Sequence, residues 1–157
     1  RTVSSGSVWG GGVDTGTAID PQCPSGPSGR WTYRIQAKDF LKRLAVGGER
    51  LMGLEPLLAL GGGRAEKFSL RLPDQTMELN ANDLRLKVGS TQLKSTRFSM
   101  KRDGDELVFR GRGFGHGVGL CQWGSRHLGK HGFSYEKILA HYYPKARLEH
   151  RELTASF

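Results

Sequence analysis

The sequence has few cysteines, few prolines and no long apolar segment. Among its 157 residues, 2 are cysteine and 6 are proline. No apolar run approaches the ~20 residues that a membrane-spanning helix needs, and nothing resembles a signal peptide. Cys23 and Cys121 stand 98 positions apart without a CxxC pair, so they suggest no disulfide framework. We therefore expect no membrane span in this chain.

Clusters of charge are also missing, although the chain is basic. The 24 Lys and Arg residues against 15 Asp and Glu give a net charge of +9. A basic chain of this kind can bind nucleic acid, anionic lipid or an acidic polymer such as cell wall. The basic residues are scattered, no run of five occurs, and no RRM, KH, zinc-finger or homeodomain signature is present. We therefore expect no nucleic-acid partner.

Glycine is what the sequence has in excess. It accounts for 23 of 157 residues, about twice the usual ~7%. The excess predicts many tight turns or one glycine-rich site, and it excludes a coiled coil or a helical solenoid. The length favours a single domain with a core of its own.

The hydrophobic periodicity predicts an α+β fold. Short strands should form a small curled sheet or barrel, and two helices should close the chain at its C-terminus. Asn80 is placed to cap a short helix that ends at Gly89, and Asp103-Gly104 signals a β-hairpin. Residues 1–30 are rich in glycine and proline and should form a loop. The expected strands lie at 31–35, 54–60, 64–72, 77–79, 98–100 and 107–109, and the expected helices at 37–46, 80–89, 117–130 and 134–143.

One segment, residues 111–124, is rich in alternating glycines and lies between an expected strand and an expected helix. It has no Lys for a P-loop and no βαβ context for a dinucleotide fingerprint. Glycines here let the backbone approach a ligand closely. In an extended stretch Arg112 and His116 would project on one side, with Phe114 between them. The alternative is that the glycines only allow close packing around a core histidine.

The candidate ligand-binding residues are Arg112, Gly113, Gly115, His116, Gly117, Gln122 and Trp123. This segment and its surroundings resemble the stage II sporulation protein D (SpoIID) and LytB amidase-enhancer family of bacterial cell-wall proteins. The resemblance extends over nearly the whole chain. It rests on Asp20-Pro21-Gln22-Cys23, Leu93 to Phe98, the glycine-rich segment, Gly132 to Tyr135 and His141 to Pro144.

The resemblance implies a peptidoglycan lytic transglycosylase that cleaves peptide-stripped glycan strands by acid catalysis. The implied partners are glycan strands and a cell-wall amidase, and the implied location is extracytoplasmic. In this chemistry one carboxylic acid protonates the glycosidic oxygen. The alternative is a non-catalytic module that binds cell wall or stimulates an amidase.

The chain departs from the family pattern in one respect. The family's catalytic glutamate lies in an upstream helix with no counterpart here, so the catalytic residue stays unknown. We expect a processed or excised piece, the C-terminal portion of one SpoIID-like domain spanning residues 1–157. Its parts would be the loop 1–30, the strands and short helices of 31–110, the glycine-rich motif and closing helices of 111–144, and the tail 145–157.

The family resemblance also bears on the cysteines. Relatives with a Cys at the position of Cys23 often have one at the position of Cys121. This implies a zinc site to which Cys23, Cys121 and His116 would supply three ligands. A disulfide between the two cysteines and a pair of free thiols are equal alternatives.

Overall fold

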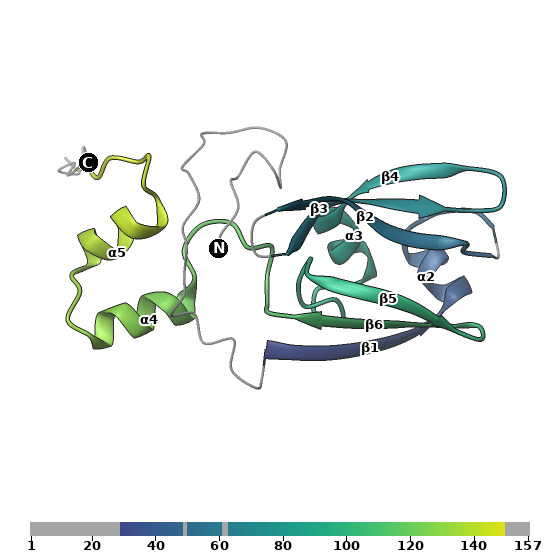
Figure 1. Ribbon diagram of the computed structural model, residues 1–157, viewed down its shortest axis with the longest axis horizontal. Coiled ribbons are helices and arrows are strands. Elements are labelled where there is room, and N and C mark those ends of the chain that lie inside the picture. Colours follow the sequence, from purple (N-terminus) through teal and green to yellow (C-terminus); the bar gives the residue numbers. More distant parts are fainter. Residues whose placement is uncertain (1–28, 49, 61–62, 150–157) are drawn as a thin grey trace, which may run out of the picture.

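The structure is a computed structural model in which residues 29–48, 50–60 and 63–149 are described. These residues form two three-stranded antiparallel sheets, with strand orders β1-β6-β5 and β2-β3-β4 (Figure 1). The strands are β1 (Arg30–Gln36), β2 (Gly53–Leu60), β3 (Arg64–Arg71), β4 (Thr76–Asn80), β5 (Phe98–Asp103) and β6 (Glu106–Arg112). The helices are α2 (Ala37–Arg43), α3 (Ala81–Val88), α4 (Gln122–Lys130) and α5 (Tyr135–Tyr142).

The predicted α+β class is confirmed, with two helices at the C-terminal end. Within the described ranges the strands form two separate sheets and no closed barrel. The hairpin predicted at Asp103-Gly104 joins β5 to β6, and Gly104 takes the positive φ of 60° that a tight turn favours. The loop predicted for residues 1–30 lies outside the described residues, except for Gly29 and Arg30, where β1 begins.

Aromatic rings from both sheets meet in the core. The ring of Phe98 on β5 stacks on Phe68 of β3, with centroids 4.7 Å apart. The same ring meets Phe109 of β6 edge-on at 5.5 Å and Trp31 of β1 at 6.0 Å. Offset and edge-to-face pairs at these separations add to the stabilisation from buried area. The first sheet is therefore fixed against the second through its inner face.

Helix α3 shows how local sequence sets a boundary. Asn80 lies at the N-cap, where its side-chain oxygen accepts hydrogen bonds from the backbone N–H groups of Asn82 and Asp83. Gly89 ends the helix with a φ of 120°. Leu84 and Val88 are fully buried. The predicted helix is therefore confirmed at both ends.

The closing helices differ from prediction at one boundary. Helix α4 begins at Gln122, whereas the sequence predicted a start near residue 117. The preceding glycines adopt left-handed backbone conformations that cannot propagate a right-handed helix, so the helix starts only after Cys121. Ser134 occupies the N-cap of α5 as predicted, although its side chain makes no capping hydrogen bond. Figure 1 shows both helices at the opposite end of the molecule from the β5–β6 turn. Within the described ranges, no helix combines the length and apolar character needed to cross a bilayer.

Candidate functional site

The segment that connects β6 to α4, which we call the glycine-rich turn (residues 113–121), has an unusual backbone. Gly113, Gly115, Gly117 and Gly119 have φ values of 77°, 70°, 85° and 73°. For a residue with a Cβ atom, this left-handed backbone conformation is less stable by about 1–2 kcal/mol. The alternation of glycine with larger residues is therefore a conformational requirement of this turn. Close packing alone does not explain it.

The start of the turn is held by the N-terminal edge of β1. The N–H of Gly113 donates to the carbonyl of Gly29 at 2.6 Å. The indole Nε1 of Trp31 donates to the carbonyl of Gly113 at 3.2 Å. A Cβ atom at Gly111 would lie 2.1 Å from the Trp31 ring, so glycine is required there for space. Trp31 is thus both a core residue and a support of the turn.

A second support is the segment Lys94 to Arg97, which immediately precedes β5. The Ser95 hydroxyl is fully buried and donates to the carbonyl of Arg112 at 2.6 Å. The N–H of Arg112 donates to the Arg97 carbonyl at 3.0 Å, and the N–H of Gly115 donates to the Lys94 carbonyl at 2.7 Å. A parallel bridge between Ser95 and Gly115 continues this pairing. Two of the segments that carry the family resemblance, Leu93 to Phe98 and the glycine-rich segment, are therefore adjacent in the fold.

Arg64, at the start of β3, is a site residue that the sequence did not indicate. Its Nη1 donates to the carbonyl of Gly115 at 2.9 Å and its Nη2 to that of Phe114 at 3.2 Å. A Cβ atom at Gly117 would lie 2.5 Å from its Nε. Arg64 precedes the turn by about fifty positions and belongs to the other sheet, so no local pattern in the sequence could have revealed the contact.

His116 is half-buried in the turn. Its Nδ1 accepts a hydrogen bond from the backbone N–H of Val118 at 3.0 Å, which requires that Nδ1 carry no proton. Burial lowers the pKa of His116, and the nearby charges of Arg85 and Arg64 lower it further. The lowered pKa favours the neutral imidazole at pH 7. A neutral imidazole suits hydrogen bonding to an uncharged hydroxyl or amide.

Two exposed aromatic rings lie at the two ends of the turn, each beside a cation. Phe114 is 56% exposed and Trp123, in the first turn of α4, is 57% exposed. The Lys94 Nζ lies 5.6 Å from the centroid of Phe114, and the Arg126 guanidinium carbon lies 5.6 Å from that of Trp123. These distances fall within the range of cation–π contacts. The rings offer flat apolar surface with adjoining hydrogen-bond donors.

The other predicted site residues surround the same turn. Arg112 ends β6 and Gln122 begins α4, and both are exposed. Strand β6 stops at Arg112, so the extended backbone assumed between Arg112 and His116 does not continue through Gly113 and Gly115. That their side chains face one cleft stays a prediction.

The fit of a zinc ion depends on a residue that the structure does not describe. Cys121 lies at the N-cap of α4, where its Sγ accepts from the N–H of Gly124 at 3.4 Å. Across the described ranges, no three His, Cys, Asp or Glu side chains are grouped so that they could hold a metal ion. Cys23 lies outside those ranges, so the zinc, disulfide and free-thiol alternatives all stay predictions.

Comparison with known proteins finds three relatives that carry two names. No family model matches. The amidase enhancer of Bacillus subtilis is 37% identical over 73 residues, which is 46% of this chain and 10% of that protein. Stage II sporulation protein D of the same organism is 42% identical over 65 residues, 41% of this chain and 18% of that protein. The protein of that name from Bacillus amyloliquefaciens is 39% identical over 66 residues.

This chain matches between a tenth and a fifth of the length of these relatives. The resemblance that the glycine-rich motif suggested is confirmed over a little more than two fifths of the chain. Over that segment, the chain is similar in sequence to proteins of the SpoIID and LytB amidase-enhancer family.

Proposed function

We propose that this chain is part of a peptidoglycan-acting protein and that its glycine-rich turn binds glycan strands. The observation that carries the proposal is the pair of exposed rings, Phe114 and Trp123, at the two ends of a glycine-built turn. Sugar rings present apolar faces that stack on aromatic rings, together with hydroxyl and acetamido groups that need donors and acceptors. The names of the relatives, an amidase enhancer and a sporulation protein, agree with a role in the cell wall.

The polar groups of the turn can supply the rest of a glycan site. Arg112 carries guanidinium donors, and the exposed Gln122 can both donate and accept. The neutral imidazole of His116 adds a group that desolvates at less cost than a charged one. We assign these three side chains to hydrogen bonding with sugar substituents.

Residues 1–157 should bind glycan without cleaving it. A lytic transglycosylase needs a carboxylic acid to protonate the glycosidic oxygen. The sequence has no Asp or Glu between Glu106 and Glu136, a stretch that contains the whole turn. Glu106 is itself engaged with Arg34 at 2.9 Å. The activity that the resemblance implies therefore needs a proton donor that this stretch does not supply.

Cosedimentation with insoluble, peptide-stripped glycan tests the binding. Phe114→Ala and Trp123→Ala should each weaken binding roughly twofold to thirteenfold, the effect of about 0.5–1.5 kcal/mol of stacking. The control is Phe133→Ala, because Phe133 is also an exposed ring (48%) but follows α4 and lies outside the turn. Equal binding by all four proteins, with circular dichroism spectra unchanged, would overturn the proposal.

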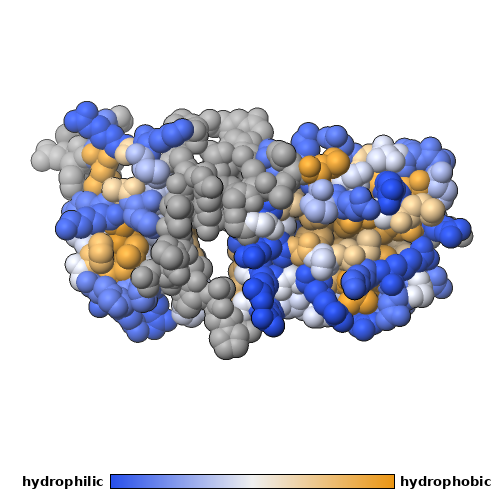
Figure 2. All heavy atoms as spheres, viewed as in Figure 1, coloured by the Kyte–Doolittle hydropathy of each residue, from blue (hydrophilic) through white to orange (hydrophobic). Residues whose placement is uncertain are grey.

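A second function, stimulation of an amidase, is favoured by one relative's name and by the surface of the closing helices. Large apolar side chains on or next to α4 and α5 are exposed, among them Phe133, Tyr135 and Leu148 at 48–55%. Figure 2 shows hydrophobic residues at this end of the molecule, surrounded by hydrophilic ones. Addition of the chain to a purified wall amidase tests this function. Stimulation that survives Phe114→Ala and Trp123→Ala but is lost on Phe133→Ala would assign it to the helices.

A further inference from the structure

The strand register places basic residues in rows on one face of the β1-β6-β5 sheet. Residues that pair across adjacent strands share a face, and alternate rows face opposite sides. The row of Trp31, Gly111 and Phe98 faces the core. The outer rows that carry basic residues are Arg30–Arg112–Arg97, Thr32–Arg110–Ser99 and Arg34–Val108–Lys101, and a fourth outer row, Gln36–Glu106–Asp103, is acidic. The hydrogen bond from the Arg112 N–H to the Arg97 carbonyl extends the β5–β6 register by the one pair that the first row needs.

We call this surface the basic face. It carries five exposed cations, Arg30, Arg34, Lys101, Arg110 and Arg112, whereas the guanidinium of Arg97 lies beside Gly63, which directly precedes β3 of the other sheet. Three of them, Arg34, Lys101 and Arg110, help line one shallow depression together with Ser99 and Val108. The face therefore combines concavity with mainly positive charge, and Asp103 is the one carboxylate that lines the depression.

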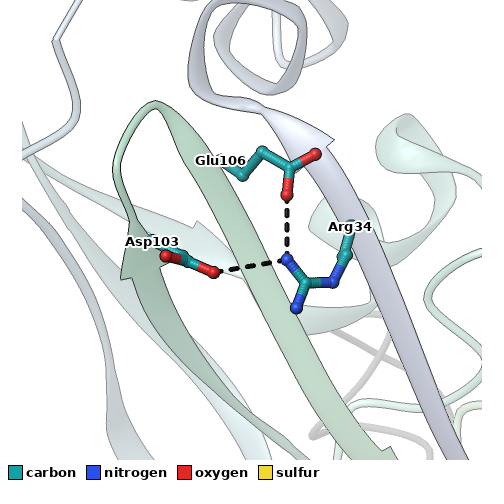
Figure 3. A network of polar contacts seen from close by, with 3 residues as sticks. All are labelled: Arg34, Asp103 and Glu106. Carbon is teal, nitrogen blue, oxygen red and sulfur yellow. Dashed lines mark hydrogen bonds and ion pairs between the residues drawn. The ribbon is translucent and has the colours of Figure 1, made fainter.

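Carboxylates neutralise only the far end of the basic face. The Arg34 guanidinium pairs with the carboxylates of Glu106, at 2.9 Å, and of Asp103, at 3.4 Å (Figure 3). Within the described part of the chain, the other four cations of the face form no ion pair. On the other sheet the pattern differs, because Lys67 pairs with Glu78 and Arg71 with Glu55. The uncompensated charge thus lies at the end of the face that adjoins the glycine-rich turn.

This arrangement costs stability in the absence of a ligand. Arg30 and Arg112 are directly opposite on neighbouring strands, and like charges in that position repel. Alternate residues of a strand are about 6.8 Å apart, so the three rows place positive charge at regular intervals over about 14 Å. A regular series of anions along the strands would relieve the repulsion.

We propose that the basic face binds the carboxylates of an extended glycan strand that continues from the glycine-rich turn. The inference rests on the proposed function, and it deepens it by naming the charged groups that are recognised. A peptide-stripped peptidoglycan strand bears a free carboxylate on every second sugar, so it is a regular polyanion. Arg112 joins the face directly to Gly113 of the turn. A polyol phosphate chain would match the charge, but it has no sugar backbone to stack on the exposed Phe114 ring at the start of the turn.

The test compares two double variants of residues 1–157 with the same net charge. Lys101→Gln/Arg110→Gln removes two cations from the basic face. Lys38→Gln/Lys42→Gln removes two exposed cations from α2, whose buried side packs in the core. The probes are peptide-stripped glycan, the same glycan with its carboxylates converted to methylamides, and a polyglycerol phosphate. Binding is measured at about 50 and 200 mM NaCl.

We expect wild type to bind the stripped glycan more tightly than the amidated one, and more tightly at low salt. The basic-face variant should bind the stripped glycan roughly fivefold to tenfold less tightly, since each exposed charge pair is worth up to about 1 kcal/mol. The α2 variant should match wild type.

The result that would overturn this inference differs from the result that would overturn glycan binding by the turn. Equal binding of stripped and amidated glycan, with both double variants like wild type, would overturn this inference and leave glycan binding by the turn intact. Failure of wild type to bind either glycan would overturn both. Binding of polyglycerol phosphate alone, weakened in the basic-face variant, would assign the face to a phosphate polymer and reject the glycan.

Discussion

The hydroxyl of Tyr143 accepts a hydrogen bond from the backbone N–H of Leu120 at 3.1 Å. This contact joins the end of α5 to the glycine-rich turn, across α4 and the loop that follows it. A Cβ atom at Gly119 would lie 2.8 Å from the same hydroxyl, so glycine leaves the space in which Tyr143 sits. The closing helices are therefore part of the structure that positions the turn.

Tyr143→Phe should loosen this connection. The variant keeps the ring and removes only the acceptor, so the Leu120 N–H loses its partner. The free energy of unfolding should fall by about 0.5–1.5 kcal/mol. Urea titration measures the loss, and hydrogen exchange should show faster exchange at Leu120. Tyr135→Phe is the control, because Tyr135 is 55% exposed and should lose little stability. Unchanged exchange at Leu120 in Tyr143→Phe would show that the contact does not hold the turn.

Gly117→Ala and Gly104→Ala should separate conformational cost from steric cost. Both glycines have positive φ, 85° and 60°. Each alanine should therefore cost about 1–2 kcal/mol from backbone conformation alone. At Gly117 the new Cβ would also meet the Arg64 side chain at 2.5 Å, whereas nothing lies within 4 Å at Gly104. Thermal unfolding should show a lower Tm for Gly117→Ala than for Gly104→Ala. Equal Tm values would mean that Arg64 moves aside freely.

Helix boundaries and tight turns in this fold could be predicted from the sequence, because residues at those positions determine them. Asn80 and Gly89 bound α3 because cap geometry is set by the residue at the end of the helix. Asp103-Gly104 fixed the hairpin for a similar reason. The start of α4 was predicted too early, because four left-handed glycines keep the backbone from entering a helix until Cys121.

The site was predictable only in its contiguous part. The glycine-rich segment is visible because its residues are neighbours in the chain. Its supports come from the N-terminal end of β1 and from the second sheet, as with Trp31 and Arg64. The basic face could not be predicted from the sequence either, because its cations are widely separated along the chain. Only the register of three strands brings Arg30, Arg112 and Arg97 into one row.

His116 should give the protein a stability that depends on pH. Its folded-state pKa is lowered by burial and by the charges of Arg85 and Arg64 below the ordinary value of about 6.5. The unfolded chain then binds the proton more readily, so the stabilisation is complete above about pH 6.5 and is lost as pH falls through the folded-state pKa.

Urea titrations between pH 5 and pH 8 should show this loss in wild type and a smaller one in His116→Asn, whose side-chain oxygen can still accept from Val118. A His116 pKa above about 6.5 by NMR titration would contradict the prediction.

Cys23 and Cys121 should lie close together in the folded chain, although only Cys121 is described in the structure. A shared zinc ion or a disulfide would require this, since linked sulfur atoms lie only a few ångströms apart. After chelation and reduction, a short bifunctional thiol reagent should cross-link the two cysteines within one molecule. Mass spectrometry of the digest identifies the linked peptides, and Cys23→Ser is the control. Only singly modified cysteines under native conditions would show that the sulfur atoms lie apart.

Arg64 should act as a positioning residue for the glycan site rather than as a residue that touches glycan. Its guanidinium donates to the carbonyls of Gly115 and Phe114 and so fixes the backbone that presents the Phe114 ring. Arg64→Met retains much of the apolar stem and removes both donors. It should speed hydrogen exchange across residues 113–119 and weaken binding of peptide-stripped glycan roughly tenfold, the effect of about 1.4 kcal/mol. Arg64→Lys keeps the charge but cannot make both hydrogen bonds, so it should resemble Arg64→Met in exchange. If Arg64→Lys instead bound glycan like wild type while its turn exchanged faster, the charge of Arg64 would be what matters, and its positioning role would be rejected.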